Sequence, residues 1–186
     1  MSNFDNTIGQ NGKNNTQTNN ITNNYNPTNN GSFSSLLGSD IVFDHNALKE
    51  IIILVHKKIG ENNHSLEIDR SSIDIDKKNT INNHSKSYFT NVVEKDFYPC
   101  FSQLENFIRL KENKELQEKL ESIIKDLNRR ILAFQEDNIE TKFEKILLDI
   151  SQNIISKNYT LMKSKERQIL LLLYYFYTNC LIGKKK

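Results

Sequence analysis

Five His and Asp side chains between residues 61 and 84 could bind a metal ion, and they are the first candidates for chemistry. They are His64, Asp69, Asp74, Asp76 and His84. A calcium loop places several oxygen ligands at alternate positions and needs a Gly for its sharp turn. Asp74 and Asp76 have that spacing, but two lysines follow them where further oxygen ligands are needed. The spacing therefore does not predict a metal site, and we expect no cofactor.

The two cysteines are the next candidates, because a thiol can act as a nucleophile or a metal ligand. Cys100 and Cys180 both lie in apolar stretches, and neither belongs to a C-x-x-C pair. Two buried thiols in a reducing compartment are the expectation. The sequence also lacks a glycine-rich phosphate loop, an H-E-x-x-H zinc motif and a G-x-S-x-G nucleophile elbow. We predict no catalytic residues and a protein that is not an enzyme.

Helices must position these side chains, and the most apolar stretch that could form one is residues 168–183. From Ile169 to Tyr177 every residue is aliphatic or aromatic, so a helix through it has no polar face. Such a helix belongs in the middle of a bundle or in a membrane. Arg167 and Lys184 leave 16 residues between them, whereas a membrane span needs about 20 apolar residues. We predict the central helix of a bundle, and a membrane-inserting effector remains an alternative.

Amphipathic patterns precede this stretch and predict the helices that surround it. Apolar residues recur every three or four positions in four stretches, namely 47–59, 88–108, 116–132 and 139–155. The links between the stretches are short, which favours antiparallel neighbours. We therefore predict an all-α fold, a helical bundle around the apolar C-terminal helix, formed by a helical interaction domain at 41–186.

Residues 61–84 are the exception to the helical pattern. Leu66 and Ile68, and then Ile73 and Ile75, alternate with polar or charged residues. Alternation with a period of two is typical of strands. This segment is expected to form either a short β-hairpin or an extended loop.

The first 40 residues have a different composition, because twelve of the first 30 are Asn. A segment with so few apolar side chains cannot offset its ordering entropy as a monomer, which favours a low-complexity tether. Asn and Gln amides can also form ladders between stacked identical strands, which favours self-assembly. The candidates for self-association, and so for a homo-oligomer, are Ile8, Gln10, Asn14, Asn15, Gln17, Ile21 and Tyr25.

Charge and targeting signals narrow the class of protein. The net charge is +2 without a basic stripe, so nucleic-acid binding is not expected. A regulator that binds nucleic acid through Lys57, Lys58, Arg129, Arg130 and the Lys184–Lys186 tail remains an alternative. The N-terminus lacks the basic and apolar regions of a signal peptide, so we expect a cytoplasmic protein with no membrane partner.

Two short motifs carry a resemblance to a known family. The stretch KKNTINNHSKSYF at 77–89 and the ending YFYTNCLIG at 175–183 resemble the C-terminal domains of bacterial ABC-three-component systems, with a likeness extending over residues 75–184. Leu181 stands where that family ending has an acidic residue, which puts a contact by that residue in doubt. The matched positions are Asn79, Asn82, Ser85, Tyr88, Asn179 and Gly183. All of them except Ser85 are our candidate interaction residues.

The resemblance implies a function that depends on protein partners. Such systems resemble anti-invader (antiphage) conflict modules, in which this domain works beside a middle component and an SMC-like ATPase. A non-catalytic adaptor that docks those partners is therefore our leading hypothesis. The same matched residues could instead serve as caps and turns. In that interpretation Asn179 bonds free helix carbonyls and Gly183 takes the left-handed position that ends the last helix.

Overall fold

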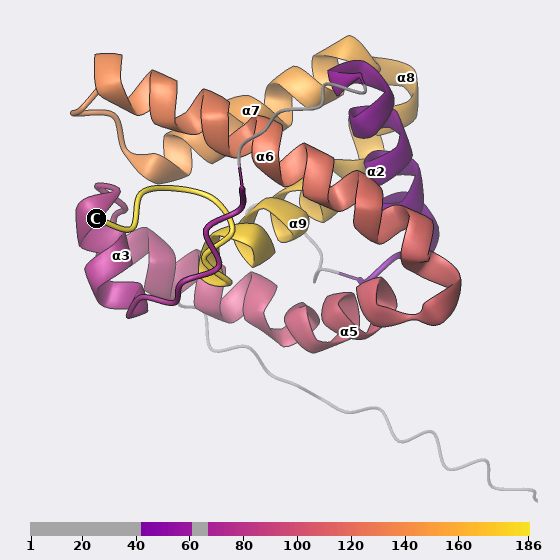
Figure 1. Ribbon diagram of the computed structural model, residues 1–186, viewed down its shortest axis with the longest axis horizontal. Helices are drawn as coiled ribbons and strands as arrows, with labels where there is room; N and C mark the ends of the chain where they lie inside the picture. Colours follow the sequence, from indigo (N-terminus) through magenta and orange to yellow (C-terminus); the bar gives the residue numbers. More distant parts are fainter. Residues whose placement is uncertain (1–41, 61–66) are drawn as a thin grey trace, which may run out of the picture. The chain divides into compact units, whose positions relative to one another are not determined.

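The structure is a computed structural model that describes residues 42–60 and 67–186 (Figure 1). The seven self-association candidates of the Asn-rich segment lie outside these residues. The helices are α2 (His45–Ile59), α3 (Ile75–Ile81), α4 (Lys86–Tyr88), the π-helical segment Phe89–Phe97, α5 (Tyr98–Arg109), α6 (Lys114–Asp137), α7 (Phe143–Lys157), α8 (Tyr159–Met162) and α9 (Glu166–Thr178), with 3-10 turns at Lys111–Asn113 and Lys163–Lys165. The described residues contain no strand, so the predicted all-α class is confirmed.

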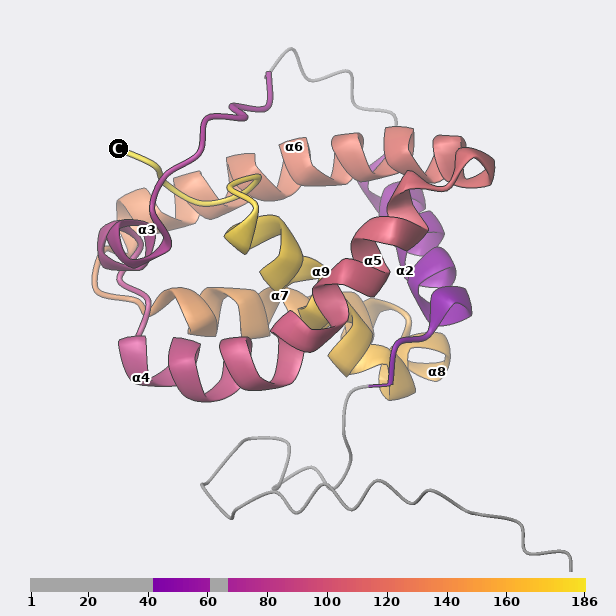
Figure 2. The same cartoon turned by 90° about the horizontal axis from the view of Figure 1, so that it is seen from below.

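The apolar helix α9 is the centre of the bundle, as predicted. It runs between α6 and α7 (Figure 2) and packs against α2, α5, α7 and the π-helical segment. Buried side chains occupy every position from Gln168 to Tyr174, and Phe176 and Tyr177 follow. None of the helices among the described residues combines the length and the apolar character needed to cross a bilayer.

The end of α9 differs from the expectation for Gly183. Cys180 adopts the left-handed conformation, with φ 58°. The N–H of Leu181 donates to the carbonyl of Phe176 at 2.8 Å, and the N–H of Cys180 donates to that of Tyr177 at 3.1 Å. This pair of bonds is a Schellman motif, usually closed by Gly. Gly183 also has a positive φ of 84°, but it lies in the tail that follows, so it does not end the helix.

Residues 67–84 contain a helix that the sequence pattern did not predict. Residues 67–74 have no regular structure, in agreement with the loop alternative, while the β-hairpin alternative is wrong for the described part of the segment. The carboxylate of Asp74 begins α3 by accepting from the N–H groups of Asp76 and Lys77 at 3.0 and 3.1 Å. The buried face of α3 consists of Lys78 and Asn79. The helix was missed because its buried residues are polar and make no apolar stripe.

Candidate functional site

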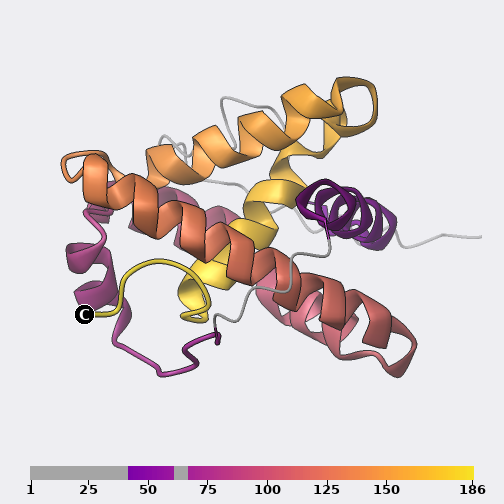
Figure 3. The same cartoon turned by 45° about the horizontal axis from the view of Figure 1, so that its top comes forward.

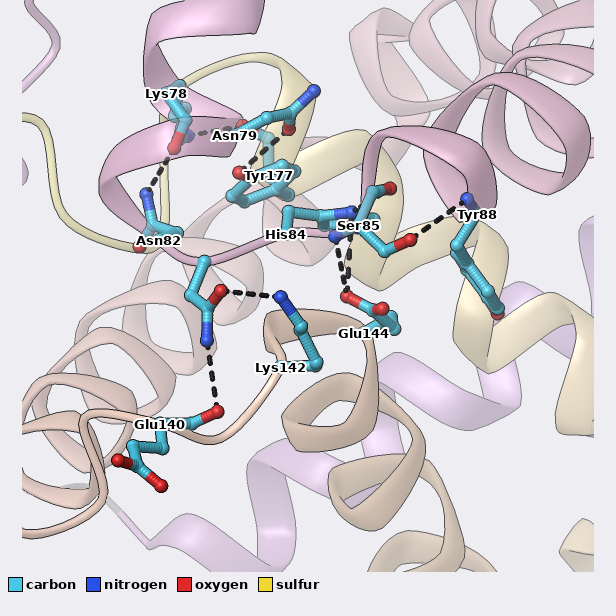
Figure 4. Close-up of polar contacts among 11 residues, drawn as sticks. Lys78, Asn79, Asn82, His84, Ser85, Tyr88, Glu140, Lys142, Glu144 and Tyr177 are labelled. Carbon is cyan, nitrogen blue, oxygen red and sulfur yellow. Dashed lines mark hydrogen bonds and ion pairs between the residues drawn. The ribbon is translucent and has the colours of Figure 1, made fainter.

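Asn82, which follows α3 and bonds the carbonyl of Lys78 (Figure 4), holds the C-terminal tail through both ends of its amide group. Its Oδ1 accepts from the N–H of Lys184 and its Nδ2 donates to the carbonyl of that residue, both at 2.8 Å. Nδ2 also donates to the carbonyl of Lys78 at 3.0 Å, and Oδ1 also accepts from Nε2 of Gln135 at 3.3 Å. An Asn amide offers two donors and two acceptor sites. All four are therefore used inside the chain, at a residue that is 1% exposed.

Gly183 fits this site because it has no side chain. A Cβ at this position would lie 3.0 Å from Oδ1 of Asn82, 3.3 Å from Phe143 and 3.4 Å from Tyr177. Its N–H donates to Oδ1 of Asn128 on α6 at 3.0 Å. The positive φ and the close neighbours together require Gly here.

The next residue of the tail, Lys185, is held by the loop before α3. The Lys185 ammonium donates to the carbonyl of Ser71 at 3.0 Å and to that of Asp69, whose carboxylate lies 3.5 Å from it. The tail thus contacts α6, the loop at 69–71 and the residues at the end of α3.

Lys78 and Asn79 join α3 to the end of α9. The hydroxyl of Tyr177 donates to Oδ1 of Asn79 at 3.0 Å, and the Lys78 ammonium donates to the carbonyl of Tyr177. The ammonium also lies 4.3 Å from the centre of the Tyr177 ring, close enough for a cation–π contact. We call Lys78, Asn79, Asn82 and Tyr177, together with residues 183–185, the tail clamp.

The Lys78 side chain is fully buried, with no exposed surface. Burial disfavours the charged form and lowers the pKa of Lys78 to about 8, although the neighbouring Cys180 thiol offsets part of this effect. Cys180 and Cys100 are both buried, and neither is part of a disulfide, as the sequence predicted.

His84 lies beside the tail clamp and is enclosed by aromatic rings. Its ring is stacked on Tyr177 with centroids 5.6 Å apart and meets Phe89 edge to face at 5.4 Å. Burial lowers the pKa of His84, and the Glu144 carboxylate, 3.6 Å from Nδ1, offsets this only in part. The ring is therefore neutral near pH 7. Its Nδ1 carries the proton, because this atom faces Glu144 and, at 3.2 Å, the carbonyl of Ser85.

The remaining matched positions lie apart from the tail clamp. Ser85 begins α4 by accepting from the N–H of Tyr88 at 3.3 Å, as the capping interpretation expected. Tyr88 is half-buried, and its ring lies 5.9 Å from that of His84. Asn179 is exposed, and its amide donates to the carbonyl of Tyr175 in its own helix at 2.9 Å.

The candidate metal ligands have separate structural roles. Asp74 caps α3, Asp69 accepts from the N–H of Ser71 at 2.8 Å, and His84 belongs to the aromatic cluster. His64 lies outside the described residues. Across 42–60 and 67–186, three or more His, Cys, Asp or Glu side chains nowhere gather in a way that could hold a metal ion.

A second feature is an open groove between α6 and α7. The two helices are close at the loop that joins them and diverge toward α2 (Figure 3). Two adjoining hollows of about 310 and 530 Å³ lie between them and share Arg130, Ile150 and Asn153. We call this the α6–α7 groove. Its apolar lining consists of Leu127, Ile131 and Phe134 of α6, Ile146, Ile150 and Ile154 of α7, and Val55 and Ile59 of α2.

The end of the groove at α2 is rich in cations. Lys58, Arg130 and Lys157 come from three different helices, and both lysines are exposed. Neither lysine forms an ion pair with any residue in the described part of the chain. The one carboxylate there, Asp126, accepts from Arg130 at 2.6 Å and from Arg129 at 2.9 Å. Burial by itself would raise the pKa of Asp126, but these two hydrogen bonds lower it, so this carboxylate is charged and already paired.

Comparison with protein families decides what kind of domain this is. The family model for C-terminal domain 12 of the ABC-three component systems matches residues 37–183. The chain belongs to this family. The resemblance drawn from the two motifs is thereby confirmed, and the match covers every helix from α2 to α9. No curated protein and no solved structure matches the chain.

Several residues of this domain-12 chain have roles that the sequence did not single out. Lys78 differs from its neighbour Lys77 only in that it faces inward, and nothing in the sequence marks that difference. Gln135 does leave a signal, since it continues the apolar stripe of Leu127 and Ile131 at the same spacing of four. A polar residue on a buried stripe predicts an internal hydrogen bond, and Gln135 makes one to Asn82.

The basic residues of the nucleic-acid alternative are partly engaged within the chain. Arg129 and Arg130 both bind Asp126, and Lys185 binds the loop at 69–71. Lys57 and Lys58 are exposed in the last turn of α2. Lys58 and Arg130 both line the α2 end of the α6–α7 groove.

Proposed function

We propose that this protein is a non-catalytic adaptor of an anti-invader conflict system, which docks the other components of its system through the helical domain. The observation that carries the proposal is the family match over residues 37–183. A domain defined by membership of a multi-component system has other components to contact. Its partners on this view are the middle component and the ABC-type ATPase.

A difference in accessibility between two regions of the domain supports a docking role. Both candidate amides are buried and used inside the chain: Asn82 holds the chain's own tail, and Asn79 accepts from the hydroxyl of Tyr177 in α9. A partner could bind either amide only by breaking these internal hydrogen bonds. The α6–α7 groove, by contrast, leaves apolar side chains accessible, and Phe134 is 42% exposed there. Exposed apolar surface of this kind is typical of protein interaction sites.

Co-purification tests the adaptor role directly. The full chain, tagged at the N-terminus, is co-expressed with the other components encoded in its own system, and each component is then assayed for retention. We expect at least one component to be retained in a stable stoichiometry. Retention of none of them, singly or together, contradicts the adaptor function.

We also propose that the Asn-rich segment at 1–40 self-associates. Light scattering after size-exclusion chromatography measures the mass of the full chain and of a variant in which Ile8, Ile21 and Tyr25 are replaced by Ser. The expected result is an oligomer for the natural sequence and a smaller species for the variant, because the apolar contacts between stacked strands are lost. Identical monomers contradict the self-association and leave the segment as a tether.

A further inference from the structure

We propose that the α6–α7 groove binds an amphipathic helix of a partner component, with acidic residues beside its apolar face. This inference rests on the proposed adaptor function and assigns it a surface and a kind of partner. The apolar groove, its length and the cations at one end carry the argument.

The shape of the groove fits a helix. Its lining on α7 extends from Ile146 to Lys157, which at 1.5 Å per residue is about 16 Å, or three helical turns. A helix lays side chains at i, i+3 or i+4 and i+7 into a groove between two others. Addition of a strand is the other common way to bind a peptide, but the described residues offer no sheet edge.

The lining of the groove requires an apolar face on the partner. Phe134, Ile150 and Ile154 are accessible or half-buried above a floor of fully buried residues such as Ile131. Beneath the α2 end, Val55, Leu127 and Ile154 contact a further small gap that reaches Leu172 and Phe176 of α9. The floor is therefore the hydrophobic core itself, and a polar strand such as single-stranded nucleic acid would not match it.

The charges at the α2 end of the groove favour a partner that carries negative charge there. Lys58 and Lys157 have no ion-pair partner among the described residues, and Asp126 is already shared by two arginines. Asp149 is the other carboxylate that lines the groove, and it lies in the second hollow. A partner with Asp or Glu beside its apolar face would therefore pair with both lysines, whereas a basic flank would be repelled.

The test compares matched variants of the full chain in binding to the purified components of its own system. Phe134→Glu places a charge in the groove, and Leu110→Glu places the same charge on a side chain of nearly equal exposure outside it, 44% against 42%. We expect Phe134→Glu to weaken binding of the partner at least about tenfold. Leu110→Glu should bind as the natural sequence does.

The charge argument has its own matched pair. The double variant Lys58→Glu with Lys157→Glu is expected to weaken binding, most strongly at low salt, because salt screens exposed charges. The control replaces Lys86 and Lys114, two exposed lysines outside the groove, by Glu. Equal effects of the two double variants overturn the acidic character of the partner.

A photo-crosslinking residue placed at position 134 identifies what occupies the groove. The expected product joins it to a partner segment with apolar residues at helical spacing and Asp or Glu beside them. A crosslink to a basic or non-helical segment, or between two copies of this chain, overturns the proposal. If the natural chain retains a partner and Phe134→Glu retains it equally, the groove is excluded while the adaptor function stands. If the natural chain retains no component, the adaptor function itself fails.

Discussion

The tail clamp and the α6–α7 groove differ in which side chains they bury and which they leave accessible. In the tail clamp, polar residues are buried, and Asn82 satisfies all four of its hydrogen-bonding sites within the chain. In the groove, apolar residues are left accessible, and the lysines at its α2 end have no ion-pair partner in the described chain. One region is closed on itself, and the other is open.

The difference separates residues that build the domain from residues available to a partner. Three of the six matched motif positions, Asn79, Asn82 and Gly183, lie in the closed region, and none of the six lines the groove. The open region contains no recognisable motif, because an apolar stripe on a helix has the same pattern whether it faces the core or a partner. A motif therefore marks family membership here and does not by itself locate the binding surface.

The largest expected effect is on stability, from the loss of the Asn82 amide. Asn82→Ala should lower the free energy of unfolding by about 4 kcal/mol, since it leaves buried partners of four hydrogen bonds unsatisfied. Urea denaturation of the natural chain and the variant measures this loss in the free energy of unfolding. Asn179→Ala is the control, because this exposed amide bonds only within its own helix, and a change within about 0.5 kcal/mol is expected. Equal losses for both variants would show that the tail clamp is not a special region.

The buried Lys78 of the tail clamp should make the stability of the protein depend on pH. The native state releases the Lys78 proton near pH 8, whereas the unfolded chain keeps it until about pH 10.5. Between these pH values the unfolded state binds more protons than the native state. The free energy of unfolding therefore rises as the pH increases. This gain should amount to about 3 kcal/mol at most.

The comparison that isolates this effect uses two adjacent lysines. The stability difference between the natural chain and Lys78→Met should shift in favour of the natural chain from pH 7.5 to pH 10.5, whereas the difference from Lys77→Met, at an exposed position, should not change. Parallel pH profiles for the two variants would mean that the Lys78 ammonium is solvated in the native state.

Gly183→Ala should have a smaller effect, which depends on Asn82. A Cβ in the left-handed conformation and 3.0 Å from Oδ1 of Asn82 is expected to cost about 2 kcal/mol. In the Asn82→Ala background the nearest neighbour is gone, so the cost should fall to about 1 kcal/mol. A double-mutant cycle by urea denaturation measures the coupling, and strictly additive losses would exclude the contact.

The smallest effect on stability is expected in the groove. Phe134→Glu, at an exposed position, should change the free energy of unfolding by no more than about 0.5 kcal/mol while it weakens partner binding. The same denaturation and binding measurements, made side by side, give both values. A large loss of stability would mean that Phe134 belongs to the core and that the two regions differ less than proposed.

Periodicity in the sequence was sufficient to predict the helices with apolar stripes. The stretch at 116–132 lies within α6, and the apolar run from Ile169 to Tyr177 lies within α9. Periodicity failed for α3, since the side chains that this helix buries are Lys78 and Asn79. It also could not say that Cys180, and not Gly183, closes α9. Both positions have a positive φ, but only at Cys180 do the N–H groups of that residue and the next bond back to the last carbonyls of the helix.

The sequence by itself determined the all-α class, the central apolar helix and the family. These follow from local properties, namely the period of apolar residues, the absence of charge from one stretch and short motifs. Only the tertiary structure decided that the motif residues Asn82 and Gly183 fix the tail while Asn79 joins α3 to α9. It also decided that the stripes of α6 and α7 diverge to leave a groove. Burial of a lysine, saturation of an amide and exposure of an apolar side chain depend on neighbours distant in the sequence, and those neighbours exist only once the helices have packed.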